Sequence, residues 1–171
     1  MRLEARHFWV AVAIAVVTHL SLVHAVPRAL MEAAMEKLGG GRFNAWVVAE
    51  RVTPESRQIV RPSPDFAYSA CVYDLSRGPI TIRIAPWEQY WSLSLYAANS
   101  DNFYVVDDRE AQHGVTILLA RRRPRDADDR EAVFVKSPSA RGIALIRRLA
   151  PTVETHAAAA RAAQGDVCAR R

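Results

Sequence analysis

Apolar and polar residues alternate through residues 61–108, and this period of two predicts a series of short β-strands. Residues 80–85 read ITIRIA and residues 91–96 read WSLSLY, so every second side chain is large and apolar in both segments. Gly78 and Pro86 stand at the ends of these segments, where glycine tolerates positive φ and proline removes a backbone donor. The pattern predicts half-buried strands joined by tight turns.

The same density of short alternating segments extends over residues 43–150 and predicts the fold class. We expect a mainly β protein, with an antiparallel β-sandwich or jelly-roll-like domain and helices only at the two ends. Ile82, Trp91, Leu93 and Leu95 should form its core, because they share one face of their strands.

The chain opens with a long apolar segment that predicts a membrane helix. Residues 8–26 read FWVAVAIAVVTHLSLVHAV, which contains no Asp, Glu, Lys or Arg. About 20 residues suffice to cross a bilayer as a helix. Val23-His24-Ala25 also fits a signal-peptide cleavage site after Ala25, so the segment is either a retained transmembrane helix or a removed signal peptide. Because few residues precede it, we expect a single-pass protein of the inner membrane with its carboxyl-terminal domain in the periplasm.

Two further helices are expected at the borders of the β-domain. Residues 27–38, PRALMEAAMEKL, have apolar side chains at helical spacing, and three glycines follow as a joint. Near the other end, PTVETHAAAARAAQ predicts a helix, and we expect the tail from Asp166 to Arg171 to be frayed. The predicted organisation is a cytoplasmic cap (1–7), the membrane helix or signal peptide (8–26), an amphipathic helix with a glycine linker (27–42), the β-domain (43–150), and a carboxyl-terminal helix with its tail (151–171).

Composition narrows the possible partners. The 171 residues carry a net charge of +5 with acidic residues interspersed throughout. The most basic stretch, RRRPRDADDRE at residues 121–131, has no interleaved aromatic residues, so we read it as an exposed hairpin loop and expect no nucleic-acid partner. The expected partner is the lipid bilayer.

Cys71 and Cys168 are the only cysteines. We expect Cys71 to be a buried free thiol because Cys168 lies in the tail, and a periplasmic disulfide is the alternative.

Several short motifs in order resemble a known bacterial family. They are PDFAYS (64–69), DLSRGP (74–79), YWS (90–92) and NF (102–103). They resemble the family called domain of unknown function 1254, in a short, membrane-anchored form without a following second domain. The resemblance implies a fold but no assigned activity. It also implies a possible envelope partner, or a second domain encoded separately.

The motif residues supply the candidate ligand-binding side chains: Asp65, Tyr68, Asp74, Tyr90, Trp91 and Asn102. Asp65 and Asp74 also suit a purely structural role, because aspartate before a turn accepts hydrogen bonds from nearby backbone N–H groups. Arg83 is a possible ion-pair partner of Asp74 or of Glu88.

The function we favour is a membrane-anchored cell-envelope β-domain that acts as a binding or accessory module. The alternative is a hydrolase-like envelope enzyme with a site near Asp65, Tyr68, Tyr90 and Trp91. No catalytic residue is assigned, because Ser69 lacks the glycines of a nucleophile elbow and His113 sits in an ordinary turn. No motif for a cofactor or a metal ion is present.

Overall fold

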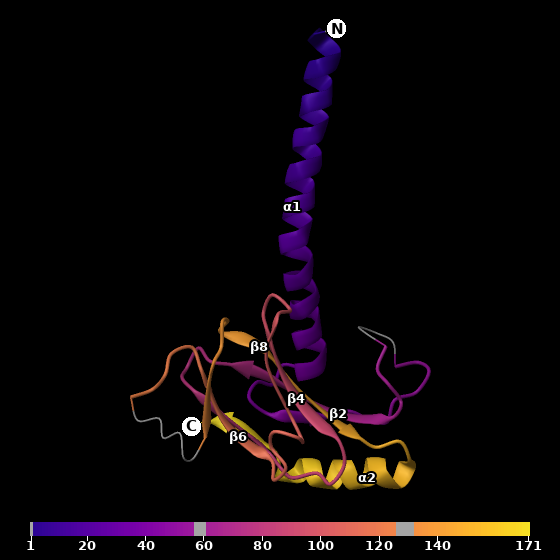
Figure 1. Ribbon diagram of the computed structural model, residues 1–171, viewed down its shortest axis with the longest axis vertical. Helices are drawn as coiled ribbons and strands as arrows, with labels where there is room; N and C mark the ends of the chain where they lie inside the picture. Colours follow the sequence, from indigo (N-terminus) through magenta and orange to yellow (C-terminus); the bar gives the residue numbers. More distant parts are fainter. Residues whose placement is uncertain (1, 57–60, 126–131) are drawn as a thin grey trace.

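The computed structural model describes residues 2–56, 61–125 and 132–171, which form a two-layer β-sandwich beneath one long helix (Figure 1). The predicted fold class is therefore confirmed. In chain order the elements are α1 (Arg2–Gly39), β1 (Trp46–Val48), β2 (Phe66–Asp74), β3 (Ile80–Ile84), β4 (Trp91–Ala97), β5 (Asn102–Asp107), β6 (Val115–Ala120), β7 (Val133–Lys136), β8 (Arg141–Leu149), α2 (Val153–Ala162), a 3-10 turn (Ala163–Gly165) and β9 (Val167–Arg170).

The layer next to α1 is an antiparallel five-stranded sheet in the order β1-β2-β8-β4-β5. Its centre is β8, which pairs with β2 along one side and with β4 along the other. The register places Asp74 opposite Arg141 at one end of the β2–β8 pair and Phe66 opposite Leu149 at the other. The sheet therefore brings residues about seventy positions apart in sequence into direct contact.

The second layer is a four-stranded sheet in the order β7-β6-β3-β9. Strands β3 and β6 are antiparallel, whereas β6 and β7 run parallel. The prediction of a hairpin loop at residues 121–131 is therefore wrong, because parallel neighbours need a crossover connection rather than a hairpin turn. Residues 126–131 of that segment lie outside the described residues.

The core lies between the two sheets and follows the alternation seen in the sequence. Ile82, Trp91, Leu93 and Leu95 are all completely buried, as predicted. Further core side chains come from both sheets, namely Tyr73, Ile80, Ile117, Leu119, Ala144 and Ile146.

The first helix differs from its prediction, because α1 runs without a break through Pro27 and joins the apolar segment to the residues that touch the domain. On the sheet side, Met31 and Met35 pack against Val72 and Ile143 on the outer face of the five-stranded sheet. This tertiary contact favours a continued helix over the break that proline alone would cause. The separate helix expected at residues 27–38 is therefore the last third of one helix, whose axis leaves the sheet as a stalk (Figure 1).

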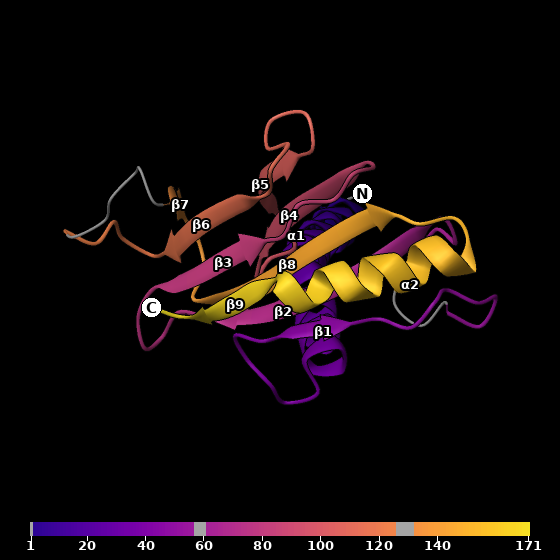
Figure 2. The ribbon, with the colours of Figure 1, turned by 90° about the horizontal axis from the view of Figure 1, so that it is seen from below.

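The carboxyl terminus is an ordered part of the sandwich. Strand β9 pairs with β3 and aligns Cys168 with Ile82, and Figure 2 shows α2 and β9 following one another along the lower layer. Cys168 forms a disulfide with Cys71 of β2, which links the two sheets. The expectations of a frayed tail and of a free Cys71 thiol are both wrong. They rested on the local composition of the tail, whereas the pairing of β9 with β3 is a long-range contact.

Candidate functional site

The predicted ligand-binding residues do not form one site, and Trp91 is excluded from any surface site. Trp91 is completely buried among the core side chains between the sheets. It shares the inner face of β4 with Leu93 and Leu95, so the alternation that makes it a core residue also turns it away from solvent. Asn102 is exposed and begins the edge strand β5, where it pairs only with Tyr96 of β4.

Asp65, Tyr68 and Tyr90 gather around Phe66, at the end of the five-stranded sheet where β2 begins. The Phe66 ring lies 6.4 Å from that of Tyr68 and 5.9 Å from that of Tyr90, centroid to centroid. The Tyr68 hydroxyl accepts a hydrogen bond from the Ser63 backbone N–H at 3.0 Å, and the Asp65 carbonyl accepts one from Ala150 at 2.7 Å. These bonds hold the entry to β2. The Asp65 bond uses its backbone carbonyl, so the turn-capping role expected of its carboxylate stays a prediction.

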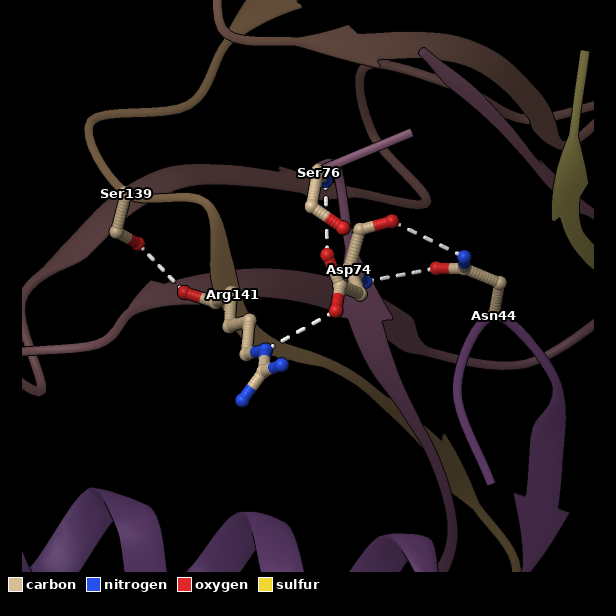
Figure 3. Close-up of polar contacts among 5 residues, drawn as sticks. All are labelled: Asn44, Asp74, Ser76, Ser139 and Arg141. Atoms are coloured by element: carbon tan, nitrogen blue, oxygen red, sulfur yellow. Dashed lines mark hydrogen bonds and ion pairs between the residues drawn. The ribbon is translucent and has the colours of Figure 1, made fainter. Parts of the chain in front are cut away.

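Asp74 lies at the opposite end of β2, in a polar cluster of Asn44, Asp74, Ser76, Ser139 and Arg141 (Figure 3). One carboxylate oxygen of Asp74 accepts a hydrogen bond from the Ser76 backbone N–H at 2.8 Å. The other accepts the Arg141 Nε–H at 3.0 Å. The first bond confirms the turn role predicted for Asp74. The second corrects its predicted partner, because Arg83 lies on β3 of the other sheet.

Asn44 fixes the backbone of the same aspartate. Its side-chain carbonyl accepts from the Asp74 N–H at 2.8 Å, and its amide donates to the Asp74 carbonyl at 3.1 Å. Asn44 has φ of 55°, in the left-handed region that asparagine tolerates better than most residues. Just before β1, the Asn44 side chain thus forms the pair of hydrogen bonds with the Asp74 backbone that a neighbouring strand would otherwise form.

The electrostatics of the cluster favour an ionised carboxylate. The hydrogen bonds with Ser76 lower the pKa of Asp74, and the charge of Arg141 lowers it further, while partial burial opposes the shift. The Asp74 side chain is only 12% exposed, whereas that of Arg141 is 50% exposed. Asp74 therefore orients Arg141 without enclosing it.

A cavity of about 180 Å³ adjoins Arg141, between the last turns of α1 and the segment that follows them. The guanidinium of Arg141 lies over the Phe43 ring, 5.1 Å from its centroid. In Figure 3 one of its terminal nitrogens projects toward α1. The cavity is lined by Glu32, Met35, Glu36, Gly41, Arg42, Phe43 and Arg141. Such a lining can hold a small polar ligand through charge-assisted hydrogen bonds.

The residues weighed for catalysis do not come together. Ser69 is buried in β2, whereas His113 lies in the turn before β6 and lines a second pocket of about 300 Å³ together with Arg83 and Gly165. Within the described part of the chain, no three His, Cys, Asp or Glu side chains gather closely enough to hold a metal ion.

Comparison with known proteins identifies the domain. The family model described as protein of unknown function (DUF1254) matches residues 43–169, which cover the sandwich from the segment before β1 into β9. The chain belongs to the DUF1254 family. No curated protein matches the chain.

Two solved structures resemble the DUF1254 fold seen here. The VPA0106 protein from Vibrio parahaemolyticus matches with a TM-score of 0.67 at 10% sequence identity, over 86% of this chain and 36% of its own. An uncharacterised protein from Burkholderia cenocepacia matches with a TM-score of 0.47 at 15% identity, over 67% of this chain and 33% of its own. This chain thus corresponds to about a third of each of those longer proteins, and the first likeness establishes a shared fold.

Four residues of this candidate site were not suggested by the sequence. They are Asn44 and Arg141 of the DUF1254 domain, and Glu32 and Glu36 of α1, which precedes it. Arg141 faces Asp74 through the register of β2 with β8, and nothing local to Arg141 marks that pairing. Glu32 and Glu36 offered a signal, because residues four apart on a helix share a face. That spacing indicates a binding site only when the structure shows that Arg141 lines the same cavity.

Proposed function

We propose that this chain is a single-pass, membrane-anchored protein of the cell envelope whose DUF1254 domain lies outside the cytoplasm and acts as a binding module. The observation that carries the proposal is the division of α1 into two parts. Its apolar part has a mean hydropathy of 2.0 over an 18-residue window, none of which is buried against the domain. Such a surface is costly in water and suits the hydrocarbon core of a bilayer.

The remaining part of α1 supports a fixed placement of the domain relative to the membrane. Met31 and Met35 pack on the sheet, and the Ser100 hydroxyl of the β4–β5 turn donates to the Pro27 carbonyl at 2.9 Å. Pro27 directly follows the apolar segment. The outer face of the five-stranded sheet would therefore face the bilayer, with the β4–β5 turn at the level of the membrane surface.

The disulfide supports placement of the domain in an oxidising compartment. Cys71 and Cys168 are bonded across the two sheets, and such bonds persist in the periplasm and other oxidising spaces but rarely in the cytosol.

Binding is proposed to use the residues that remain accessible at the two ends of the sheet. Asp74 orients Arg141 beside the cavity under α1, and Asp65, Tyr68 and Tyr90 surround Phe66 at the far end. Asn102 is a further candidate on the exposed edge strand. The accessory role could involve an envelope protein or a separately encoded second domain.

Topology reporters test the proposal directly. Alkaline phosphatase, which is active only outside the cytoplasm, and a fluorescent protein that matures only inside it are fused in turn after Arg171 of the full chain expressed in a Gram-negative bacterium. We expect phosphatase activity in the membrane fraction and no fluorescence. As a control, Ala15→Arg should reduce membrane insertion by placing a charge within the apolar segment, whereas Ala33→Arg on the exposed part of α1 should not. Fluorescence of the second fusion with an inactive phosphatase fusion would overturn the proposal.

A further inference from the structure

The cavity beside α1 has carboxylates on one side and guanidinium groups on the other. Glu32 and Glu36 line it from the helix, and Arg42 and Arg141 line it from the domain. None of the ion pairs formed among the described residues joins the two sides, although all four side chains border one space of about 180 Å³. That volume is large enough to hold a small ligand or several water molecules.

We propose that this cavity binds a small zwitterion, a molecule that carries both an ammonium group and an oxyanion such as a carboxylate or a phosphate. The inference rests on the proposed binding function and names its ligand class. The ammonium lies against Glu32 and Glu36, and the oxyanion lies against Arg141 and Arg42.

The acidic wall suits an ammonium group. Glu32 and Glu36 stand four residues apart on one face of α1, where two like charges destabilise a helix. Both are exposed, and neither forms an ion pair within the described part of the chain. An ammonium group placed between them offsets the repulsion and donates hydrogen bonds to both carboxylates.

The basic wall suits an oxyanion because Arg141 is already oriented. Its Nε–H donates to Asp74, and its guanidinium carbon lies over the Phe43 ring. The guanidinium is therefore held at the cavity, with one terminal nitrogen toward α1 (Figure 3). A fixed guanidinium offers parallel N–H groups that match a carboxylate or a phosphate. Arg42 adds a second positive charge at the rim.

The charges exclude ligands of one sign. An anion would be attracted by the two guanidiniums but repelled by the two helix carboxylates, and a cation the reverse. For an ion of one sign, the attraction and the repulsion therefore largely cancel. A zwitterion places each charge beside its opposite. The pocket thus selects for the pair of charges rather than for either one.

Two sources could supply such a ligand. Glu32 lies five residues beyond Pro27, about 7.5 Å along the helix at ~1.5 Å per residue. That distance is comparable with the thickness of the polar headgroup layer, which is roughly 5–7 Å on each side of the bilayer. An ethanolamine-type lipid headgroup and a free zwitterion both offer the required chemistry.

Titration calorimetry of the full chain in a non-ionic detergent tests the proposal. The zwitterionic probes are O-phosphoethanolamine and glycine, and the single-charge probes are ethanolamine and inorganic phosphate. We expect at least one zwitterion to bind at least tenfold more tightly than both single-charge probes. The double variant Glu32→Gln/Glu36→Gln should weaken that binding at least tenfold without lowering the unfolding temperature, and Arg42→Gln should weaken the binding less. Glu88→Gln, an exposed glutamate away from the pocket, is the matched control and should bind as the wild type does.

The source is distinguished by reconstituting the chain in phosphatidylglycerol vesicles, whose headgroup has a phosphate but no ammonium group, with or without phosphatidylethanolamine. Competition by phosphatidylethanolamine against the soluble probe indicates a headgroup ligand, and its absence indicates a soluble one; either outcome supports the zwitterion site. The proposal is overturned if neither zwitterion binds, if phosphate alone binds equally well, or if the Glu32→Gln/Glu36→Gln variant binds unchanged. Because the assay does not depend on which side of a membrane the domain occupies, its failure would leave the topology proposal standing.

Discussion

Two ion pairs at opposite ends of β8 have the same chemistry in different surroundings. Arg148 points into the sandwich and binds Asp166 through both terminal nitrogens, at 2.9 and 2.7 Å, with side chains 2% and 0% exposed. Arg141 points to the outer face and reaches Asp74 through Nε alone, at 3.0 Å, with side chains 50% and 12% exposed.

The difference separates an ion pair that is enclosed by the fold from one whose arginine remains half exposed. Asp166 also accepts the Ala85 N–H at 2.9 Å, and two residues later Cys168 joins Cys71. These contacts, which we call the C-terminal lock, tie the end of the chain to both sheets. Among the described residues, the Arg141 side chain donates one hydrogen bond, from Nε to Asp74.

Breaking the buried pair should have the largest effect. Asp166→Ala leaves the Arg148 charge enclosed without a partner, and removing one member of a buried pair typically costs about 3–5 kcal/mol. Chemical denaturation of the full chain in non-ionic detergent, followed by tryptophan fluorescence, measures the loss. The double variant Arg148→Met/Asp166→Leu should regain most of it, because no uncompensated charge remains. A loss below ~1 kcal/mol for Asp166→Ala would mean that the C-terminal lock does not hold the fold.

The disulfide should contribute the next largest effect. Reduction frees β9 from β2 in a chain whose cysteines are 97 residues apart, so the unfolded state gains conformational freedom. We expect a loss of about 2–4 kcal/mol on comparing the oxidised and reduced wild-type chain under the same denaturation. This comparison changes no side chain, unlike Cys71→Ala. Intact mass after alkylation without reductant gives the control, and labelling of either cysteine in the folded protein would contradict the bond.

The C-terminal lock also marks the limit of what could be predicted from the sequence. The strands at residues 80–85 and 91–96 and their core residues were predictable, because the period of two is a local property of a half-buried strand. The disulfide partner of Cys71 was not predictable, because Cys168 lies in a short polar tail just after Gly165 and Asp166. Only its pairing with β3 brings it beneath Cys71.

In the candidate site, too, local contacts were predictable from the sequence and long-range contacts were not. The turn role of Asp74 was predictable because the carboxylate and the Ser76 N–H are two residues apart. Its pairing with Arg141 could not be predicted, because it depends on the β2–β8 register and joins residues 67 positions apart. Trp91 shows a conflict that the sequence could have resolved, since its predicted burial beside Leu93 already argued against a role in binding ligand.

The smallest effect is expected at Asp74, on the exposed side of the comparison. Asp74→Asn keeps an acceptor for the Ser76 N–H and removes the charge beside Arg141, so the loss near neutral pH should be about 0.2–1 kcal/mol. Arg141→Gln should cause a similar loss, and the double variant should lose little more, which a double-mutant cycle measures.

The pH dependence gives the sign of this contribution. The pKa of Asp74 is lowered in the folded state, chiefly by hydrogen bonding with Ser76 and then by Arg141. The stabilisation is therefore complete above the ordinary carboxyl pKa of about 3.9 and disappears as the pH falls through the lower, folded-state value. The gap in unfolding free energy between wild type and Asp74→Asn should close in acid. A gap that persists there would indicate that the variant disturbs the turn rather than the ion pair. A gap as large as that of Asp166→Ala would show instead that Arg141 is a structural residue like Arg148, and its terminal nitrogens would then be a poor choice for holding a ligand.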